Sequence, residues 1–298
     1  MKKEKLRKKI KKITLFDVLV YGISGIMLII VAYPLVLVLS NSISDPGMVA
    51  SGQVVLLPKG INLDGYKAVF KNTDIKVGYA NTIFYTVFGT LINLVVTLPA
   101  AYALTKRSVP GRNLIMTMFM ITMYFSGGMI PTFLLVRNLG LYNSRWSILL
   151  LGAFSTYYCI VCRSFFESLP KELEESAMID GCSPMKAFIQ VVLPLSKALI
   201  GVMVLYYAVG HWNSYFNEMI YLNDDAKQPL QVILRRMLIL AQTAMDMDEG
   251  GEYALSLVKR EALLRYAVIV VSSFPLLITY PFIQKYFDQG VLIGSVKG

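Results

Sequence analysis

Long uninterrupted runs of apolar residues constrain this chain more than any other feature. Hydrophobic residues make up 55% of its 298 residues and charged residues 16%, against roughly 25% charged residues in a soluble globular domain. The apolar residues gather in stretches of the length that a helix needs to cross a bilayer, about 20 residues. The sequence therefore predicts an all-α membrane protein.

Six of these stretches are long enough to predict membrane-spanning helices. They cover residues 16–40, 78–104, 113–136, 146–166, 197–221 and 263–287. The other segments are a basic amino terminus at 1–15, a tail at 288–298, two long outer segments at 41–77 and 222–262, and a polar inner segment at 167–196. An even number of spans places both termini on the same side of the membrane.

The distribution of positive charge predicts which side that is. Eight of the first twelve residues are Lys or Arg, and they stop just before the first apolar run. Positive charge beside a spanning helix favours the cytoplasmic side, so both termini are predicted to be cytoplasmic. The apolar run of 16–39 exceeds the core of a secretory signal, about 7 to 15 residues, and is predicted to be retained. This placement of the net charge of +10 argues for a membrane anchor rather than for nucleic-acid binding.

The three cysteines predict packing rather than redox chemistry. Cys159 and Cys162 have CxxC spacing but lie inside a predicted span, and Cys182 lies in the inner segment. A redox motif needs a βαβ context, and a metal site of this type needs a second pair of ligands. Free cysteine in an apolar run behaves as a small hydrophobic residue, and no metal site is expected.

The inner segment has the pattern of two short helices separated by a turn. Pro170 precedes a run rich in glutamate, which favours a helix amino terminus, and Gly181 can end that helix with positive φ. A second helix is expected from Pro184 to Val192, stopped by Pro194. Ala177, Met178 and Ile179 form an apolar side of the first helix, a shape that can enter a groove on a soluble partner.

This segment resembles the loop of the permease subunits of binding-protein-dependent ABC importers. Their pattern is EAA, three residues, Gly, nine residues, then I-x-LP. The matching residues here are Glu175, Ser176, Ala177, Gly181, Val191, Leu193 and Pro194. Ser176 replaces the middle Ala and Val191 replaces Ile, both small changes in size.

Further phrases resemble the carbohydrate-type branch of that family, which includes the maltose permease subunits. They are FSGGMIPTFLLVRNLGLYNSRW, WNSYFNEMIYL, PLQVILRRML and the ending YPFIQKYFDQGVLIGSVKG. The resemblance implies a type I ABC importer permease fold in the bacterial cytoplasmic membrane. It also implies a multi-pass subunit of an oligosaccharide importer.

The same resemblance implies the partners and the coupling residues. The partners would be a second, related permease in a heterodimer, two cytoplasmic ATPase subunits, and an extracellular or lipid-anchored sugar-binding protein. The loop would couple to the ATPase, with Glu175 making a polar contact, Ala177 allowing close approach and Gly181 setting the turn. The coupling set is Glu175, Ser176, Ala177, Asp180, Gly181, Leu193 and Pro194. No GxxxxGK[ST] pattern occurs in the sequence, so ATP and Mg²⁺ are expected in the partner ATPases and not in this chain.

Two spans carry polar and aromatic residues at helical spacing, as expected of a sugar pathway. The second span offers Asn81, Tyr85 and Asn93, with Gly89 in the same row. The fifth span offers Tyr207, His211, Tyr215 and Glu218, with Trp212 and Asn213 beside them. Polar groups in a spanning helix are costly unless they face protein or water, so these rows are predicted to face inward. Hydrogen bonding between the two permease subunits is the alternative.

Two other functions stay open to test, which are transport of a non-sugar solute within the same family and ion-driven transport with His211 in a proton relay. A third class is a membrane enzyme. Paired acids, a metal triad or an activated nucleophile are not evident in the spans, so an enzyme is not expected. Basic residues of the outer segments suit either an acidic glycan or an acidic binding protein. They include Lys227, Arg235, Arg236, Lys259 and Arg260.

Overall fold

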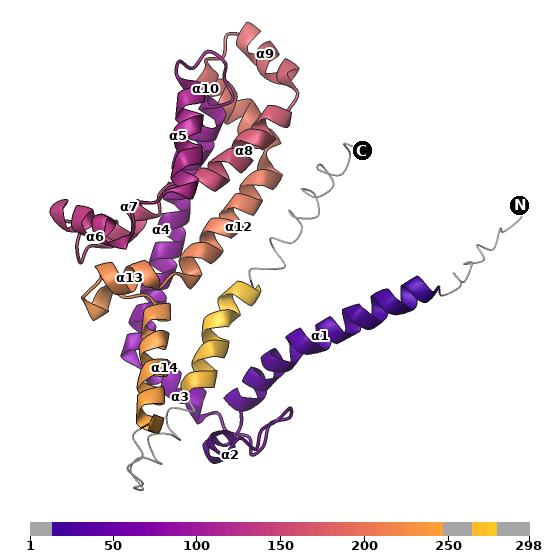
Figure 1. Ribbon diagram of the computed structural model, residues 1–298, viewed down its shortest axis with the longest axis vertical. Helices are drawn as coiled ribbons and strands as arrows, with labels where there is room; N and C mark the ends of the chain where they lie inside the picture. Colours follow the sequence, from indigo (N-terminus) through magenta and orange to yellow (C-terminus); the bar gives the residue numbers. More distant parts are fainter. Residues whose placement is uncertain (1–13, 247–263, 279–298) are drawn as a thin grey trace, which may run out of the picture. The chain divides into compact units, whose positions relative to one another are not determined.

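The protein is helical throughout the part of the chain that its structure describes. The computed structural model describes residues 14–246 and 264–278, and each regular element in these ranges is a helix (Figure 1). The predicted all-α class is therefore confirmed. The last predicted span, 263–287, lies partly outside the described residues, which include its helix Leu264–Ile278.

Within residues 14–246 and 264–278, two helices are each long and apolar enough to cross a membrane, α1 (Leu15–Ser42) and α4 (Thr73–Ala103). Thr14 begins α1 with a capping box, in which Thr14 and Asp17 hydrogen-bond each other. Asn72 begins α4 by accepting the backbone N–H groups of Asp74 and Ile75. This cap starts the helix before the apolar run begins, which is why α4 extends beyond the predicted span 78–104.

The predicted spans 113–136 and 146–166 contain breaks. Helix α5 (Arg112–Tyr124) meets α6 (Met129–Asn138) at 115°, and α7 (Arg145–Leu151) meets α8 (Thr156–Ser168) at 46°. Counting each bent pair as one span gives up to five candidates among the described residues, so the number six stays a prediction. Gly128, at φ +83°, supplies the first break. Pro131 lies in the first turn of α6, where its missing N–H has no helical partner to lose.

The chain divides into two compact units. The first contains residues 1–67 and 244–270, and the second contains 68–243 and 271–298. In the first unit, α2 (Pro46–Ala50) and the following loop return to the end of α1. The Ser40 hydroxyl donates to the Leu56 carbonyl at 2.5 Å, and the Asp45 N–H donates to the Lys59 carbonyl at 2.9 Å. Helix α3 (Asp64–Lys71) then leads into the second unit.

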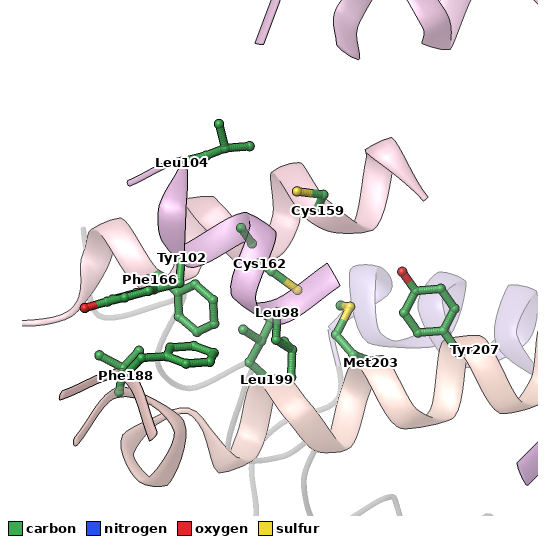
Figure 2. Close-up of a cluster of buried hydrophobic side chains, with 12 residues drawn as sticks. Leu98, Tyr102, Leu104, Cys159, Cys162, Phe166, Phe188, Leu199, Met203 and Tyr207 are labelled. Atoms are coloured by element: carbon green, nitrogen blue, oxygen red, sulfur yellow. The ribbon is translucent and has the colours of Figure 1, made fainter. Parts of the chain in front are cut away.

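In the second unit, α4 packs against α8 and α12 (Lys197–Asn213), and α5 packs against α8 (Figure 1). Tyr102, Phe166 and Phe188 form an aromatic group at one end of this core (Figure 2), with the Tyr102 and Phe188 rings stacked 4.7 Å apart. Cys159 and Cys162 are free thiols buried in the same core. They therefore pack as small hydrophobic residues, as their setting predicts.

A second core lies where α4 meets α6 and α7. It includes Tyr85, Val136, Ile148, Tyr221 and Leu222. Tyr221 ends α13 (Phe216–Tyr221), and the turn η2 (Asp225–Lys227) and helix α14 (Leu230–Asp246) follow. This core fixes the segment after α13 against α4, which places the polar row of α4 beside it.

Candidate functional site

The inner segment begins with α9 (Lys171–Ile179), and Gly181 ends that helix as predicted. Gly181 has φ +85°. The Cys182 N–H donates to the Ala177 carbonyl and the Gly181 N–H donates to the Met178 carbonyl, each at 3.0 Å. This pair of hydrogen bonds is a Schellman turn, which needs a left-handed residue at the position of Gly181.

The second helix of the segment does not stop at Pro194, and that prediction is wrong. Helix α10 (Pro184–Ala187) continues into the π turn η1 (Phe188–Val192) and then into α11 (Leu193–Leu195). A π turn widens the helix, so the proline ring avoids the preceding turn that it would strike in an α-helix. The chain bends by 84° only afterwards, between α11 and α12.

Glu174 ties α9 to the end of α4. Its carboxylate accepts a hydrogen bond from the Tyr102 hydroxyl at 2.6 Å and forms an ion pair with Lys106. The Lys106 ammonium also lies 4.4 Å from the centre of the Tyr102 ring. We call Tyr102, Lys106 and Glu174 the Glu174 cluster. Sequence reasoning missed it, because only the tertiary fold brings Lys106 to Glu174.

Glu175, the residue of the loop pattern, is exposed and has no side-chain hydrogen bond or ion pair among the described residues. Successive residues on a helix lie about 100° apart, so one glutamate can face the bundle while its neighbour faces solvent. Ser176 and Asp180 are also exposed, whereas Ala177 is half-buried. At the end of the segment, Leu193 is half-buried and Pro194 is exposed. Within the described residues, the chain therefore leaves the Glu175 carboxylate open to solvent.

Large apolar side chains of this segment are exposed as well. Ile179 is 86% exposed, and Met185 is 59% exposed. The full set, which we call the loop surface, is Leu173, Met178, Ile179, Met185, Ile189 and Leu195. A cavity of about 650 Å³ is lined by residues of α9, of α8 and of the segment that follows α4. Its charged lining includes Lys106, Arg107, Arg112, Glu167 and Glu175.

The first half of the polar row on α4 holds the loop after α13. Asn81 donates its amide N–H groups to the carbonyls of Ala226 at 2.8 Å and Gln228 at 3.0 Å. Tyr85 donates its hydroxyl to the Lys227 carbonyl at 2.9 Å. The side chains of both residues are buried. These candidates therefore have partners inside this chain, and their contact with a sugar stays a prediction.

The second half of the row contacts α12. His211 Nε2 lies 2.7 Å from Asn93 Oδ1, and the Asn93 amide donates to the Gly152 carbonyl. A Cβ atom added at Gly89 would lie 2.5 Å from His211 Nε2. Gly89 therefore makes room for the imidazole ring. One turn away, the hydroxyls of Tyr207 and Thr97 are 2.8 Å apart.

The fifth predicted span, 197–221, is not one helix, which corrects the row predicted along it. Helix α12 ends at Asn213, Ser214 is extended, and α13 begins at Phe216. Tyr215 and Glu218 therefore leave the helical face that Tyr207 and His211 share. We call residues 213–217 the α12–α13 break.

Some side chains in and next to the α12–α13 break are buried and others are exposed. Trp212 is buried and donates its indole N–H to the Ser272 carbonyl at 3.1 Å. Glu218 is buried and accepts the Ser214 hydroxyl at 2.9 Å. Asn213 and Tyr215 are exposed. Among residues 14–246 and 264–278, no three His, Cys, Asp or Glu side chains lie together as metal ligands would.

The loop that follows α13 is held by its own charges as well as by α4. Asp224 accepts the Ala226 N–H at 3.0 Å and pairs with Lys227 at 3.2 Å. The hydrogen bond from Ala226 and the contact with Lys227 hold the pKa of the Asp224 carboxyl below its usual range. Arg236 bonds the carboxylate of Asp225 at 2.7 Å and also the side chain of Gln228. Most charges of this loop are therefore satisfied within it.

Known proteins resemble this chain over nearly its whole length. A permease protein of Bacillus subtilis strain 168, the polygalacturonan/rhamnogalacturonan transport system permease protein YtcP, is 41% identical over 95% of this chain and 99% of its own. Protein LplC of the same organism is 42% identical over 89% of both chains. A solved bacterial ABC transporter involved in the import of the acidic polysaccharide alginate matches with a TM-score of 0.82 and 36% identity. That match covers 91% of this chain and 96% of the other.

Membership of a protein family is shown by a match that extends from α4 almost to the carboxyl terminus. Residues 75–293 match the family described as binding-protein-dependent transport system inner membrane component. The resemblance indicated by the EAA-type loop is thereby confirmed, and the solved relative supports the type I permease fold. The chain belongs to the binding-protein-dependent transport system inner membrane components, which are the permease subunits of ABC importers.

Proposed function

We propose that this chain is a membrane-spanning permease subunit of an ATP-driven oligosaccharide importer, and that it forms half of the translocation pathway. We also propose that it couples to a separate ATPase through the loop surface. The observation that carries the coupling proposal is the two-sided structure of α9. Glu174 is fixed to α4 through the Glu174 cluster, while Glu175 and Ile179, four residues apart on the same helix, are exposed to solvent.

A helix with an exposed apolar side and a fixed base suits docking into a groove of another protein. The Schellman turn at Gly181 holds α9 and α10 at a set angle, so both helices can enter the groove as a unit. Fixing the rear of α9 to α4 would transmit a movement of the ATPase to the membrane helices. The chain itself has no GxxxxGK[ST] pattern, so it would not catalyse ATP hydrolysis.

The other partners follow from family membership. They are a second, related permease, two ATPase subunits on the cytoplasmic side, and an extracellular or lipid-anchored binding protein that delivers the sugar. The chain would lie in the bacterial cytoplasmic membrane with both termini inside, the side on which the basic residues of 1–15 predict them. Helix α1 supports a membrane setting, because none of its apolar stretch is buried within the chain.

A sugar as the substrate is supported by the relatives. YtcP is named for the transport of polygalacturonan and rhamnogalacturonan, and the solved relative imports alginate. The aromatic and amide side chains at the α12–α13 break suit the apolar face and the hydroxyls of a sugar ring. A non-sugar solute or an ion-driven mechanism is the alternative outcome of the test below.

The test is purification of this chain from its native membrane together with whatever binds it. The reconstituted complex is then supplied with oligosaccharides and the binding protein. A second permease and an ATPase that co-purify, with ATP hydrolysis stimulated by one class of glycan, are the expected result. A chain that purifies alone and transports in response to an ion gradient without ATP would overturn the proposal.

A further inference from the structure

The α12–α13 break exposes a group of aromatic and amide side chains. Tyr215 has φ −146° and ψ −30°, so the chain turns away from the helical path there. Asn213, Tyr215, Phe216 and Asn217 are exposed, while Trp212 and Glu218 on either side are buried. The buried pair fixes the backbone of the break, and an aromatic and amide surface results.

Arg235 of α14 lies against this surface. Its guanidinium carbon is 4.9 Å from the centre of the Tyr215 ring, and both side chains are exposed. The neighbouring residues hold α14 in place, because Leu230, Ile233 and Leu234 are buried. Ile233 and Leu230 pack at Gly78 of α4, where an added Cβ would lie 2.5 Å from the Ile233 side chain. The position of Arg235 over Tyr215 is therefore set by the packing of α14 on α4.

Arg235 differs from the cations around it in its partners. Lys227 bonds Asp224 and the Asn143 carbonyl, Arg236 bonds Asp225 and Gln228, and Arg145 bonds Asn81. Among the described residues, the Arg235 guanidinium contacts the Tyr215 ring but pairs with no carboxylate and donates to no hydrogen-bond acceptor. Because Arg235 is exposed and lies in the predicted outer segment, its guanidinium is expected to face water or a ligand.

The chemistry of this group matches a sugar that carries a carboxylate. A guanidinium forms two parallel hydrogen bonds to a carboxylate, and the arginine is already positioned by the aromatic ring. An aromatic side chain beside it packs against the apolar face of a pyranose ring. The Asn217 amide can bond ring hydroxyls, as can the Asn213 amide oxygen, whereas the Asn213 amide N–H donates to the Val209 carbonyl at 3.0 Å. A neutral sugar would use the ring and the amides but not the guanidinium.

We propose that Arg235 and Tyr215 form a recognition site for the uronate residue of an acidic oligosaccharide on its way through the permease. The inference rests on the proposed function and adds to it a substrate class and the residues that select it. The side chains at this position would distinguish a carboxylate from its uncharged ester. Arg236, which is held by the loop, would not take part.

The test uses the complete transporter in liposomes with its binding protein. Uptake is measured against the concentration of an oligogalacturonate and of its methyl ester, which is neutral. The affinity of the binding protein for each glycan is measured separately, and the ratio of the two uptake efficiencies is divided by the ratio of the two affinities.

The wild type is expected to prefer the acid. Arg235→Gln is expected to lower the preference by about tenfold or more, because a charge-assisted hydrogen bond to the ligand is lost. Arg235→Lys is expected to lie between the two, and Arg236→Gln is the matched control that keeps the preference.

A second measurement distinguishes recognition of the sugar by Arg235 from docking of the binding protein by Arg235. ATP hydrolysis is measured against the concentration of the binding protein, and Arg235→Gln is expected to leave the half-maximal concentration unchanged. A several-fold rise in that concentration, with equal loss for acid and ester, would make Arg235 a docking residue and overturn the inference. So would an unchanged preference in Arg235→Gln, or a wild type that transports only neutral glycans. In each of these cases ATP-driven uptake persists, so the proposed function stands. Absence of ATP-driven uptake of any glycan would overturn the proposed function instead.

Discussion

Two adjacent glutamates on α9 have opposite environments, and this difference defines separate roles for them. Glu174 bonds Tyr102 and Lys106 within the chain, whereas Glu175 is exposed. The sequence pattern identified Glu175 alone. The role of Glu174 depends on a lysine 68 residues away, and no local signal in the sequence connects them.

Loss of the Glu174 carboxylate is expected to weaken the coupling between ATPase and pathway. In Glu174→Gln, the ion pair with Lys106 is lost, a change of about 1 to 3 kcal/mol for a charged hydrogen bond of this kind. We expect a several-fold decrease in the amount of sugar transported per ATP hydrolysed. Glu172→Gln, an exposed acid on the same helix, is the control and should behave as the wild type. The exchange Lys106→Glu with Glu174→Lys should restore part of the loss, and a double variant no better than the singles would refute the pairing.

The contact between Gly89 and His211 makes a second residue-level prediction. In Gly89→Ala, the new methyl group collides with the imidazole, and overpacking of this kind costs about 1 to 3 kcal/mol. Gly210→Ala, in α12 with open space around its Cα, should instead be neutral or gain up to about 1 kcal/mol. Thermal unfolding of both variants in detergent tests the difference. Equal melting temperatures would mean that Gly89 is not needed for this packing.

At the scale of elements, the apolar runs predicted where helices form but not where they break. Gly127 and Gly128 lie within one apolar run, and the sequence on both sides of them is equally apolar. Periodicity therefore continues across a break that the backbone makes at Gly128. Similarly, Pro194 was expected to end a helix, and the π turn before it was not predictable from residue types.

The polar row of α4 illustrates what spacing can and cannot predict. Four-residue spacing placed Asn81, Tyr85, Gly89 and Asn93 on one buried face, and the structure buries the three polar members there. Their partners could not be predicted, because Asn81 bonds a loop 145 residues further along the chain. Interactions of this separation depend on the packing of α14 and α13 on α4 rather than on local sequence.

The turn between α9 and α10 supports a prediction about the element as a whole. Gly181→Val forces a β-branched residue to adopt φ +85°, which costs about 1 to 2 kcal/mol in the left-handed region. The angle between the two helices should change, and we expect uptake and ATPase co-purification to fall while membrane insertion is retained. Gly181→Asn is the control, because asparagine tolerates this conformation. Normal uptake in Gly181→Val would show that the turn is not required.

At the scale of the whole molecule, much apolar surface is exposed in the isolated chain. Helix α1 has no buried residue in its apolar stretch, and the loop surface at α9–α11 is exposed as well. The first is expected to face lipid or the second permease, and the second is expected to face the ATPase. A permease needs one surface for the membrane and another for the ATPase, because ATP hydrolysis outside the membrane has to move helices within it.

Contact between the loop surface and the ATPase is the central claim, and thiol cross-linking tests it most directly. Ile179→Cys is made in a Cys182→Ser background, because Cys182 lies nearby, and the assembled transporter is treated with a short bifunctional thiol reagent. Leu57→Cys, at a position that is 72% exposed and lies in the predicted outer segment, is the control. We predict a cross-link from position 179 to the ATPase subunit and none from position 57. An intact, transporting complex in which position 179 does not cross-link to the ATPase would contradict the account.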